Sequence, residues 1–168
     1  MSSRTLISVE EYLASTFRPD CDYVDGHIEE RNLGERTHGR IQGRLIKYLA
    51  RFEEPGKIEV LPEVRVQVRA QRFRVPDVCV ILGDSDEEIL TEPPFLCVEI
   101  LSPEDRMTRV KERINDYFQM GVPYAWVLDP QTKKAFRATP ADGWEEVTDG
   151  VLRTEDPVLE VPLSEIFR

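Results

Sequence analysis

Two apolar segments of the chain each contain a single charged residue, and in both that residue is a carboxylate. Asp77 lies within residues 75–82 (VPDVCVIL), and Glu99 lies within residues 95–101 (FLCVEIL). Apolar runs of this length are typical of largely buried β-strands. A carboxylate in an interior of low dielectric constant costs several kcal/mol unless it is paired, hydrogen-bonded or bound to a metal. Both side chains therefore require a partner.

The positions of the two carboxylates agree with each other. If the strands pair in antiparallel fashion with Asp77 opposite Glu99, Cys79 falls opposite Cys97, and both carboxylates share one face of the sheet. Opposed Cβ atoms lie about 4.5 to 5.5 Å apart, close enough for one pKa to rise or for a divalent cation to bind both side chains. Oxygen ligands favour Mg²⁺ or Mn²⁺ over zinc. The alternative is structural, with each carboxylate paired to an arginine or a backbone amide.

The rest of the pattern predicts one mixed α/β domain over residues 1–168, with a central sheet flanked by helices. Ile41, Leu45 and Leu49 recur at helical spacing, and Val64, Val66 and Val68 alternate as in a half-exposed strand. We expect helices over about residues 8–16, 37–52 and 105–120, a hairpin at Asp25-Gly26, and strands over residues 64–69, 75–82, 95–101, 124–128, 135–139, 144–147 and 158–161. The expected helix caps are Ser8 and Thr37.

Charge is distributed unevenly along the chain. The protein carries −10 overall, which excludes a strongly basic nucleic-acid binder. Residues 31–75 nevertheless hold eleven Lys or Arg and five Asp or Glu, a net charge of +6, so the remainder carries −16. Five of these cations recur at helical spacing and form one stripe: Arg36, Arg40, Arg44, Lys47 and Arg51. We expect an anionic partner to meet this region, and a solvated surface is the alternative.

Composition excludes several classes of protein. A 40% hydrophobic and 32% charged chain is typical of a globular fold, and no apolar run approaches the roughly 18 residues of a membrane span. Residues 1–8 lack the apolar stretch of a secretory signal, which makes a cytoplasmic protein the expectation. Three cysteines at irregular spacing fit reduced thiols better than a zinc site or a disulfide framework.

An ordered set of motifs resembles a known family. Residues 74–77 (RVPD), residues 98–103 (VEILSP), and Tyr117 followed by residues 121–130 (GVPYAWVLDP) resemble the Uma-type branch of the PD-(D/E)xK, restriction-endonuclease-like nucleases. The looser match continues from the Asp25-Gly26 hairpin to the C-terminus. The resemblance implies a mixed sheet flanked by helices, Mg²⁺-dependent endonuclease activity on nucleic acid, with DNA the expected substrate, and Asp77 and Glu99 as metal ligands.

The chain departs from the superfamily at one position. The superfamily lysine would fall two residues after Glu99, where this chain has Leu101. In this branch the lysine is expected on the following helix, where Arg113 takes its position and Lys111 lies two residues earlier. Both flank the apolar stripe of that helix by about 80°. A lysine can lose a proton and help to activate water, whereas an arginine stays charged and stabilises only the phosphate.

Two further predictions concern the surroundings of the carboxylates. His38, at the start of the second helix, can orient water or phosphate, and a structural hydrogen bond is its alternative role. Cutting both strands of a duplex favours a homodimer, although no segment identifies an interface. The competing functions are a binding module for nucleic acid or protein that has lost catalysis, and, less favoured, a small-molecule phosphohydrolase.

Overall fold

The two carboxylate-bearing segments form neighbouring strands of a six-stranded sheet. The computed structural model describes residues 5–32 and 34–168. In spatial order the sheet contains β10 (Gly143–Glu146), β9 (Lys134–Thr139), β8 (Tyr124–Asp129), β7 (Leu96–Ile100), β6 (Val78–Leu82) and β3 (Ile58–Pro62). All neighbours are antiparallel except β7 and β8, whose parallel pairing uses α3 (Met107–Met120) as the crossover helix. The predicted mixed sheet is thus confirmed.

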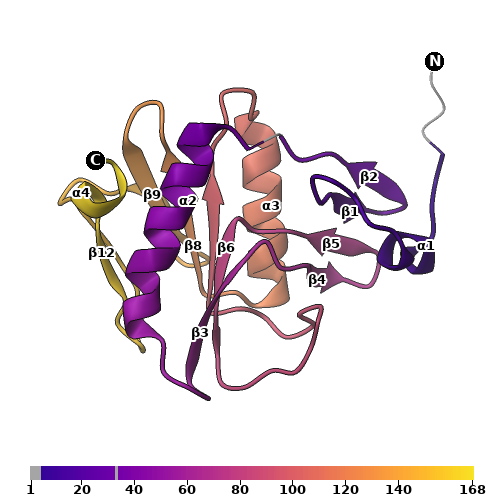
Figure 1. Ribbon diagram of the computed structural model, residues 1–168, viewed down its shortest axis with the longest axis horizontal. Coiled ribbons are helices and arrows are strands. Elements are labelled where there is room, and N and C mark those ends of the chain that lie inside the picture. The colour runs from indigo at the N-terminus through magenta and orange to yellow at the C-terminus, as the bar shows by residue number, and fades with distance from the viewer. Residues whose placement is uncertain (1–4, 33) are drawn as a thin grey trace.

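Helices cover both faces of this sheet (Figure 1). On one face, Ile41 and Leu45 of α2 (Arg36–Leu49) pack with Val78 of β6. The 3₁₀ turn η1 (Ala50–Phe52), the β11–β12 pair (Val151–Arg153 and Glu160–Pro162) and α4 (Leu163–Ile166) complete that layer. On the other face, Val110 and Ile114 of α3 pack with Cys79 and Cys97. Side-chain alternation along β6 and β7 therefore sends one set of residues to α2 and the other to α3.

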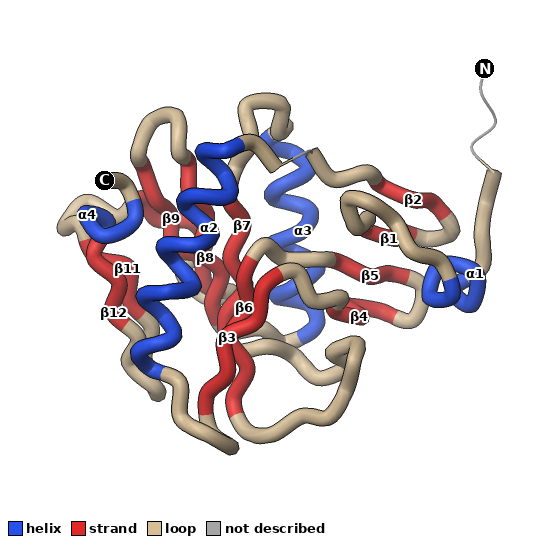
Figure 2. The backbone as a smooth tube through the Cα atoms, in the orientation of Figure 1, coloured by secondary structure: helices blue, strands red, loops and turns tan. Residues whose placement is uncertain are grey.

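A second, smaller sheet lies beside the main one (Figure 2). Its strands are β2 (His27–Glu29), β1 (Asp22–Val24), β5 (Arg72–Arg74) and β4 (Val66–Arg69), in that order, with α1 (Val9–Ala14) at its end. Tyr12, Tyr23 and Phe73 form its core. Asp25 and Gly26 both adopt positive φ, as the predicted hairpin requires. This sheet carries side chains to the edge of the carboxylate site.

The predicted register of the carboxylate strands is confirmed. Val78 pairs with Val98 and Cys79 with Cys97, which aligns Asp77 with Glu99 one position further. All three cysteines are free and buried. Within the described residues, no helix has the length and apolarity needed to cross a bilayer.

Several local predictions differ from the structure. The second helix begins at Arg36, with Glu35 at its N-cap position, so Thr37 is not the cap. Strands β3, β5 and β11 and the short helix α4 were not predicted. β3 is an edge strand with one buried residue, and β5 has three residues, so neither carries a long apolar run. Ser8 caps α1 as predicted, accepting from the Glu11 amide, and Gly121 ends α3 in the left-handed conformation.

Candidate active site

Asp77 and Glu99 lie close together at the end of the central strands that faces the small sheet. Each is 3% exposed. The amide of Ile100, the residue after Glu99, donates to Asp77 Oδ2 at 2.6 Å. This bond crosses between the two segments, so it fixes the Asp77 carboxylate beside the strand that carries Glu99.

Two cationic or ionisable side chains meet the other oxygen of Asp77. Arg31 Nη2 lies 2.5 Å from Asp77 Oδ1, and His38 Nε2 lies 3.3 Å from the same oxygen. Gln42, one turn after His38 on α2, donates to the Asp77 carbonyl at 2.9 Å. The first two turns of α2 thus hold Asp77 through its side chain and its backbone.

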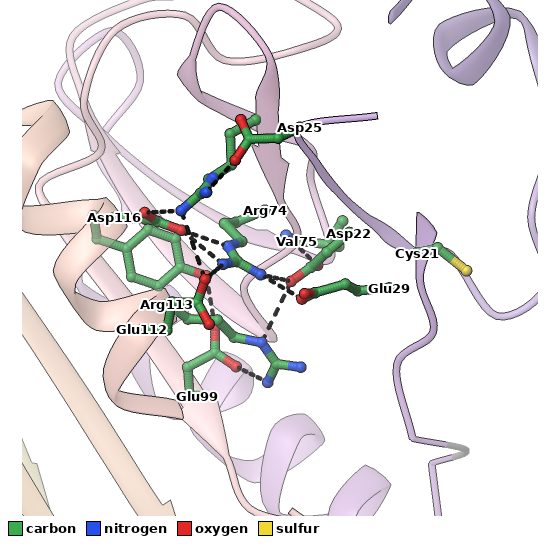
Figure 3. Close-up of polar contacts among 12 residues, drawn as sticks. Cys21, Asp22, Asp25, Glu29, Arg74, Val75, Glu99, Glu112, Arg113 and Asp116 are labelled. Carbon is green, nitrogen blue, oxygen red and sulfur yellow. Dashed lines mark hydrogen bonds and ion pairs between the residues drawn. The ribbon is translucent and has the colours of Figure 1, made fainter. Parts of the chain in front are cut away.

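Glu99 is held from α3. Tyr117 Oη donates to Glu99 Oε1 at 2.5 Å, and Arg113 Nη1 donates to Glu99 Oε2 at 3.3 Å. Figure 3 shows Arg113 between Glu99 and Asp22 of β1, whose Oδ2 lies 3.3 Å from Arg113 Nε. Arg113 therefore links the carboxylate site to the small sheet.

The two carboxylates have opposite pKa shifts. Burial raises the pKa of Glu99 to about 7, and the nearby charge of Asp77 adds to this rise, although Arg113 and Tyr117 favour the ionised form. Burial also acts on Asp77, but His38, Arg31 and the Ile100 amide hold its pKa below the usual value. The hydrogen bond to Asp77 raises the pKa of His38 despite its burial. Near neutral pH the pair therefore combines an ionised Asp77 with a readily protonated Glu99, a division typical of functional carboxylate pairs.

Glu99→Gln is expected to alter the pH dependence of stability. Because the pKa of Glu99 is about 7 in the folded protein and 4.5 for an ordinary glutamate, the native state retains a proton that the unfolded state loses between these values. Wild-type stability therefore falls as the pH rises from 5 to 8, by about 1 to 3 kcal/mol from this residue. Urea unfolding at both pH values should show this fall in the exposed control Glu92→Gln and a smaller fall in Glu99→Gln. Equal slopes would contradict the assignment.

A buried ion network supports the site from the small sheet. Arg74 is 1% exposed and contacts Asp22 (3.0 Å), Glu29 (2.9 Å) and Asp116 (2.7 Å). Figure 3 shows Arg74 at the centre of these acids, with Asp22 shared between it and Arg113. The network joins β1, β2 and β5 to α3 and so places Arg113 against Glu99.

The structure brings one of the two predicted helix cations to the carboxylates. Arg113 contacts Glu99, whereas Lys111 is exposed and lines a depression with Met107, Phe136 and Trp144. The reason is the direction of each side chain on α3. Arg113 faces the small sheet, and Lys111 faces β9 and β10 on the other side of the helix. Lys111 therefore lies away from the site.

The predicted cationic stripe lies along α2 but on the side away from Asp77. Residues two apart on a helix differ by about 160° in direction, so Arg40 and Arg44 point away from His38 and Gln42. Arg44 is half-buried and donates to the carbonyls of Ile166 and Arg168. The remaining members of the stripe are exposed: Arg36, Arg40, Lys47 and Arg51.

The positive charge of residues 31–75 is largely neutralised within the molecule. Six of its eleven cations form ion pairs with carboxylates: Arg31, Lys57, Arg65, Arg69, Arg72 and Arg74. The expectation that this whole region meets an anionic partner is therefore narrowed to the exposed part of the stripe. The net charge of a sequence window does not reveal ion pairs with carboxylates from distant parts of the same chain.

Sequence reasoning missed Arg31, Asp22 and Arg74 as parts of the site. Arg74 carried a signal, because it stands between Phe73 and Val75 in an apolar stretch where a charge requires a partner. Asp22 has a weaker signal of the same kind in a three-residue strand. Arg31 lies outside helices and strands, and nothing in its sequence neighbourhood indicates its contact with Asp77.

A small cavity of about 60 Å³ borders both carboxylates, and its lining includes Arg31, His38 and Arg113. Among residues 5–32 and 34–168, no three His, Cys, Asp or Glu side chains are grouped so as to enclose a metal ion. Mg²⁺, however, commonly uses only one or two carboxylates and takes its other ligands from water and substrate phosphates. The pair of hard oxygen donors fits a divalent cation bound in this way.

A mixed sheet flanked by helices, with an acidic pair on adjacent central strands, is the arrangement that the resemblance to restriction-endonuclease-like nucleases predicts. The family described as "Uma2: Putative restriction endonuclease" matches residues 9–165, and the chain belongs to this family. The predicted resemblance is thus confirmed. No curated protein matches the chain significantly.

A solved structure supports the same fold. The chain is similar to a protein from Anabaena variabilis described as "a putative nuclease belonging to DUF820", with a TM-score of 0.81 and 22% sequence identity. The match covers 96% of this chain and 97% of the Anabaena chain. The two chains therefore share the fold over nearly their whole length.

Proposed function

We propose that the protein is a metal-dependent endonuclease that hydrolyses phosphodiester bonds, with DNA as its substrate and Asp77 and Glu99 as the ligands of Mg²⁺ or Mn²⁺. The observation that carries this proposal is the pairing of two buried carboxylates with opposite pKa shifts on adjacent strands. Membership of a family described as restriction endonucleases supports the same class of reaction.

The side chains around the pair have separate roles in this proposal. Arg113 stays charged and can stabilise negative charge on the phosphate, but it cannot remove a proton from water. His38 orients Asp77 and can hold a proton at Nε2, which lies 3.3 Å from Asp77 Oδ1. Asp77 and Glu99 would hold Mg²⁺, and the chemistry that the ion would supply is a lowered pKa of water and a second positive charge at the phosphate.

A binding module without catalysis is the second candidate. One observation favours it: each carboxylate already has an arginine partner, Arg31 for Asp77 and Arg113 for Glu99. No lysine lines the carboxylate cavity in the described part of the chain. A module of this kind would bind its partner without a divalent cation and without cleaving it.

Cleavage assays separate the two functions. Purified protein is incubated with circular and linear, single- and double-stranded DNA and RNA, in Mg²⁺, in Mn²⁺ or in EDTA. The nuclease predicts products in the presence of the cation and none in EDTA. Binding of a nucleic acid with no product under any condition, by folded protein, would replace the nuclease with the binding module.

The exposed cations at the start of α2 are expected to contact the phosphate backbone. Arg36 and Arg40 lie nearest the carboxylates, whereas Arg51 lies roughly 20 Å further along the helix axis. Replacing both with glutamine should lower the slope of log affinity against log salt by about 2, because each phosphate contact releases about one counterion. Fluorescence anisotropy with a labelled duplex measures this slope. The matched control is Lys57→Gln/Arg137→Gln, which removes two exposed cations that line none of the cavities around the carboxylates and the start of α2. An equal effect there would contradict the assignment.

A further inference from the structure

Arg31 lies among carboxylates at the place where the site needs positive charge. Its guanidinium is 2.5 Å from Asp77 Oδ1 and 3.9 Å from Glu63 Oε1, and its side chain is 11% exposed. Burial opposes its charge, but Asp77, Glu99 and Asp22 raise its pKa. A permanent cation therefore satisfies Asp77 in the absence of a metal ion, in the position where a divalent cation would compete for the same oxygen.

Two neighbouring cavities of different size lie on either side of Arg31. Their sizes indicate that the Arg31–Asp77 pair must open for a substrate phosphate to reach the carboxylates. The inner cavity beside Asp77 and Glu99 measures about 60 Å³, enough for a few water molecules but too small for a nucleotide. An outer groove of about 770 Å³ lies next to it. Arg31, Asn32 and Ser102 line both, so they form the wall between them.

The groove needs a cation if it is to receive a phosphate. Its lining includes Glu30, Glu35 and Glu104, and its basic residues are Arg31 and Arg109. While Arg31 is paired with Asp77, its charge is not available to the groove. Asn32 donates to Asp105 Oδ1 at 2.9 Å, which anchors the backbone beside Arg31. The long arginine side chain can therefore turn from Asp77 to the groove without movement of the strands.

We propose that Arg31 is the counterion that a divalent cation must displace from Asp77, and that the displaced guanidinium then binds the substrate phosphate in the outer groove. The first step rests on the proposed metal site alone, and the second rests also on the proposed nuclease activity. Arg31 thus keeps the carboxylate pair neutralised before the metal binds and becomes a phosphate ligand afterwards. The planar guanidinium suits both partners, because it forms paired hydrogen bonds with carboxylate and with phosphate.

Arg31→Gln tests the displacement without any nucleic acid. Isothermal titration with Mn²⁺ should show binding about fivefold tighter or more than in the wild type, because a charge-assisted contact no longer competes for Asp77. Arg65→Gln is the matched control, since Arg65 is a similarly shielded arginine paired with Asp20 and has no contact with Asp77. Its Mn²⁺ affinity should equal that of the wild type. Equal or weaker Mn²⁺ binding by Arg31→Gln overturns the displacement.

Cleavage by the same variants tests the second step. At saturating Mn²⁺, Arg31→Gln should cleave at least about tenfold more slowly than Arg65→Gln, because a charged phosphate contact is lost. Tighter Mn²⁺ binding with an unchanged rate overturns the phosphate role alone. If the wild type cleaves no substrate but Arg31→Gln binds Mn²⁺ more tightly, the nuclease function fails and the displacement stands.

A measurement on the wild type covers the case in which Arg31→Gln does not fold. In ¹⁵N-labelled protein the Nε–Hε signal of Arg31, assigned with Arg31→Lys, should shift when Mg²⁺ is added. The signals of Arg65 and Arg137 should stay in place, because their partners Asp20 and Glu145 do not line the carboxylate cavity. An Arg31 signal that is unchanged at saturating Mg²⁺ overturns the proposal.

Discussion

Asp77→Asn is expected to slow cleavage at least about 10³-fold, because it removes a metal ligand and with it several kcal/mol of stabilisation of the phosphoryl transition state. The substitution keeps the shape of the side chain and removes the charge that binds Arg31 and His38. Mn²⁺ affinity should fall together with the rate. A rate within tenfold of the wild type would show that Asp77 does not hold the catalytic cation.

Two controls make the Asp77 result specific. Asp86→Asn removes an exposed carboxylate from the loop after β6 and should leave both rate and Mn²⁺ affinity unchanged. Circular dichroism and the thermal midpoint establish that Asp77→Asn is folded at the assay temperature. Duplex affinity measured in EDTA should not fall in this variant, since the backbone contacts proposed for Arg36 and Arg40 do not involve Asp77 and the loss of its charge releases Arg31 to the outer groove.

Arg74→Met is expected to destabilise the protein by about 3 to 5 kcal/mol, because it leaves buried carboxylates without their cation. Asp22 is 1% exposed and Asp116 is 3% exposed, and Arg74 contacts both. Asp22 retains Arg113 as a partner and Asp116 retains Arg72, which places the loss within this range rather than above it. Urea unfolding followed by circular dichroism measures the change.

The matched control for Arg74 is an arginine paired at the surface. Arg137 contacts Glu145 at 2.7 Å across β9 and β10, and both side chains are about half exposed. Arg137→Met should leave the urea midpoint close to that of the wild type, because exposed ion pairs contribute little. If Arg74→Met unfolds at the same urea concentration as Arg137→Met, the buried network does not hold the small sheet against α3.

Local sequence patterns predicted the strands and helices that position the two carboxylates. Alternation of side chains along Val78–Leu82 and Leu96–Ile100, together with the single carboxylate beside or within each strand, predicted the strand register and the shared face of Asp77 and Glu99. The apolar spacing of α2 and α3 predicted which face of each helix packs on the sheet. These features depend on periodicities of two and 3.6 residues, which any short segment displays.

The partners of the two carboxylates depend on segments that are far apart in the chain. Lys111 and Arg113 flank the apolar stripe of α3 at equal angles, so the helix alone does not determine which of them reaches Glu99. Arg113 lies on the side of the small sheet, where it contacts both Asp22 and Glu99. Arg31 reaches Asp77 across 46 residues from a segment without regular structure. Ion pairs of this kind have no periodicity, since their energy depends on distance and burial in the folded chain. The sequence therefore predicts the carboxylate pair, whereas only the tertiary structure identifies the cations that neutralise it.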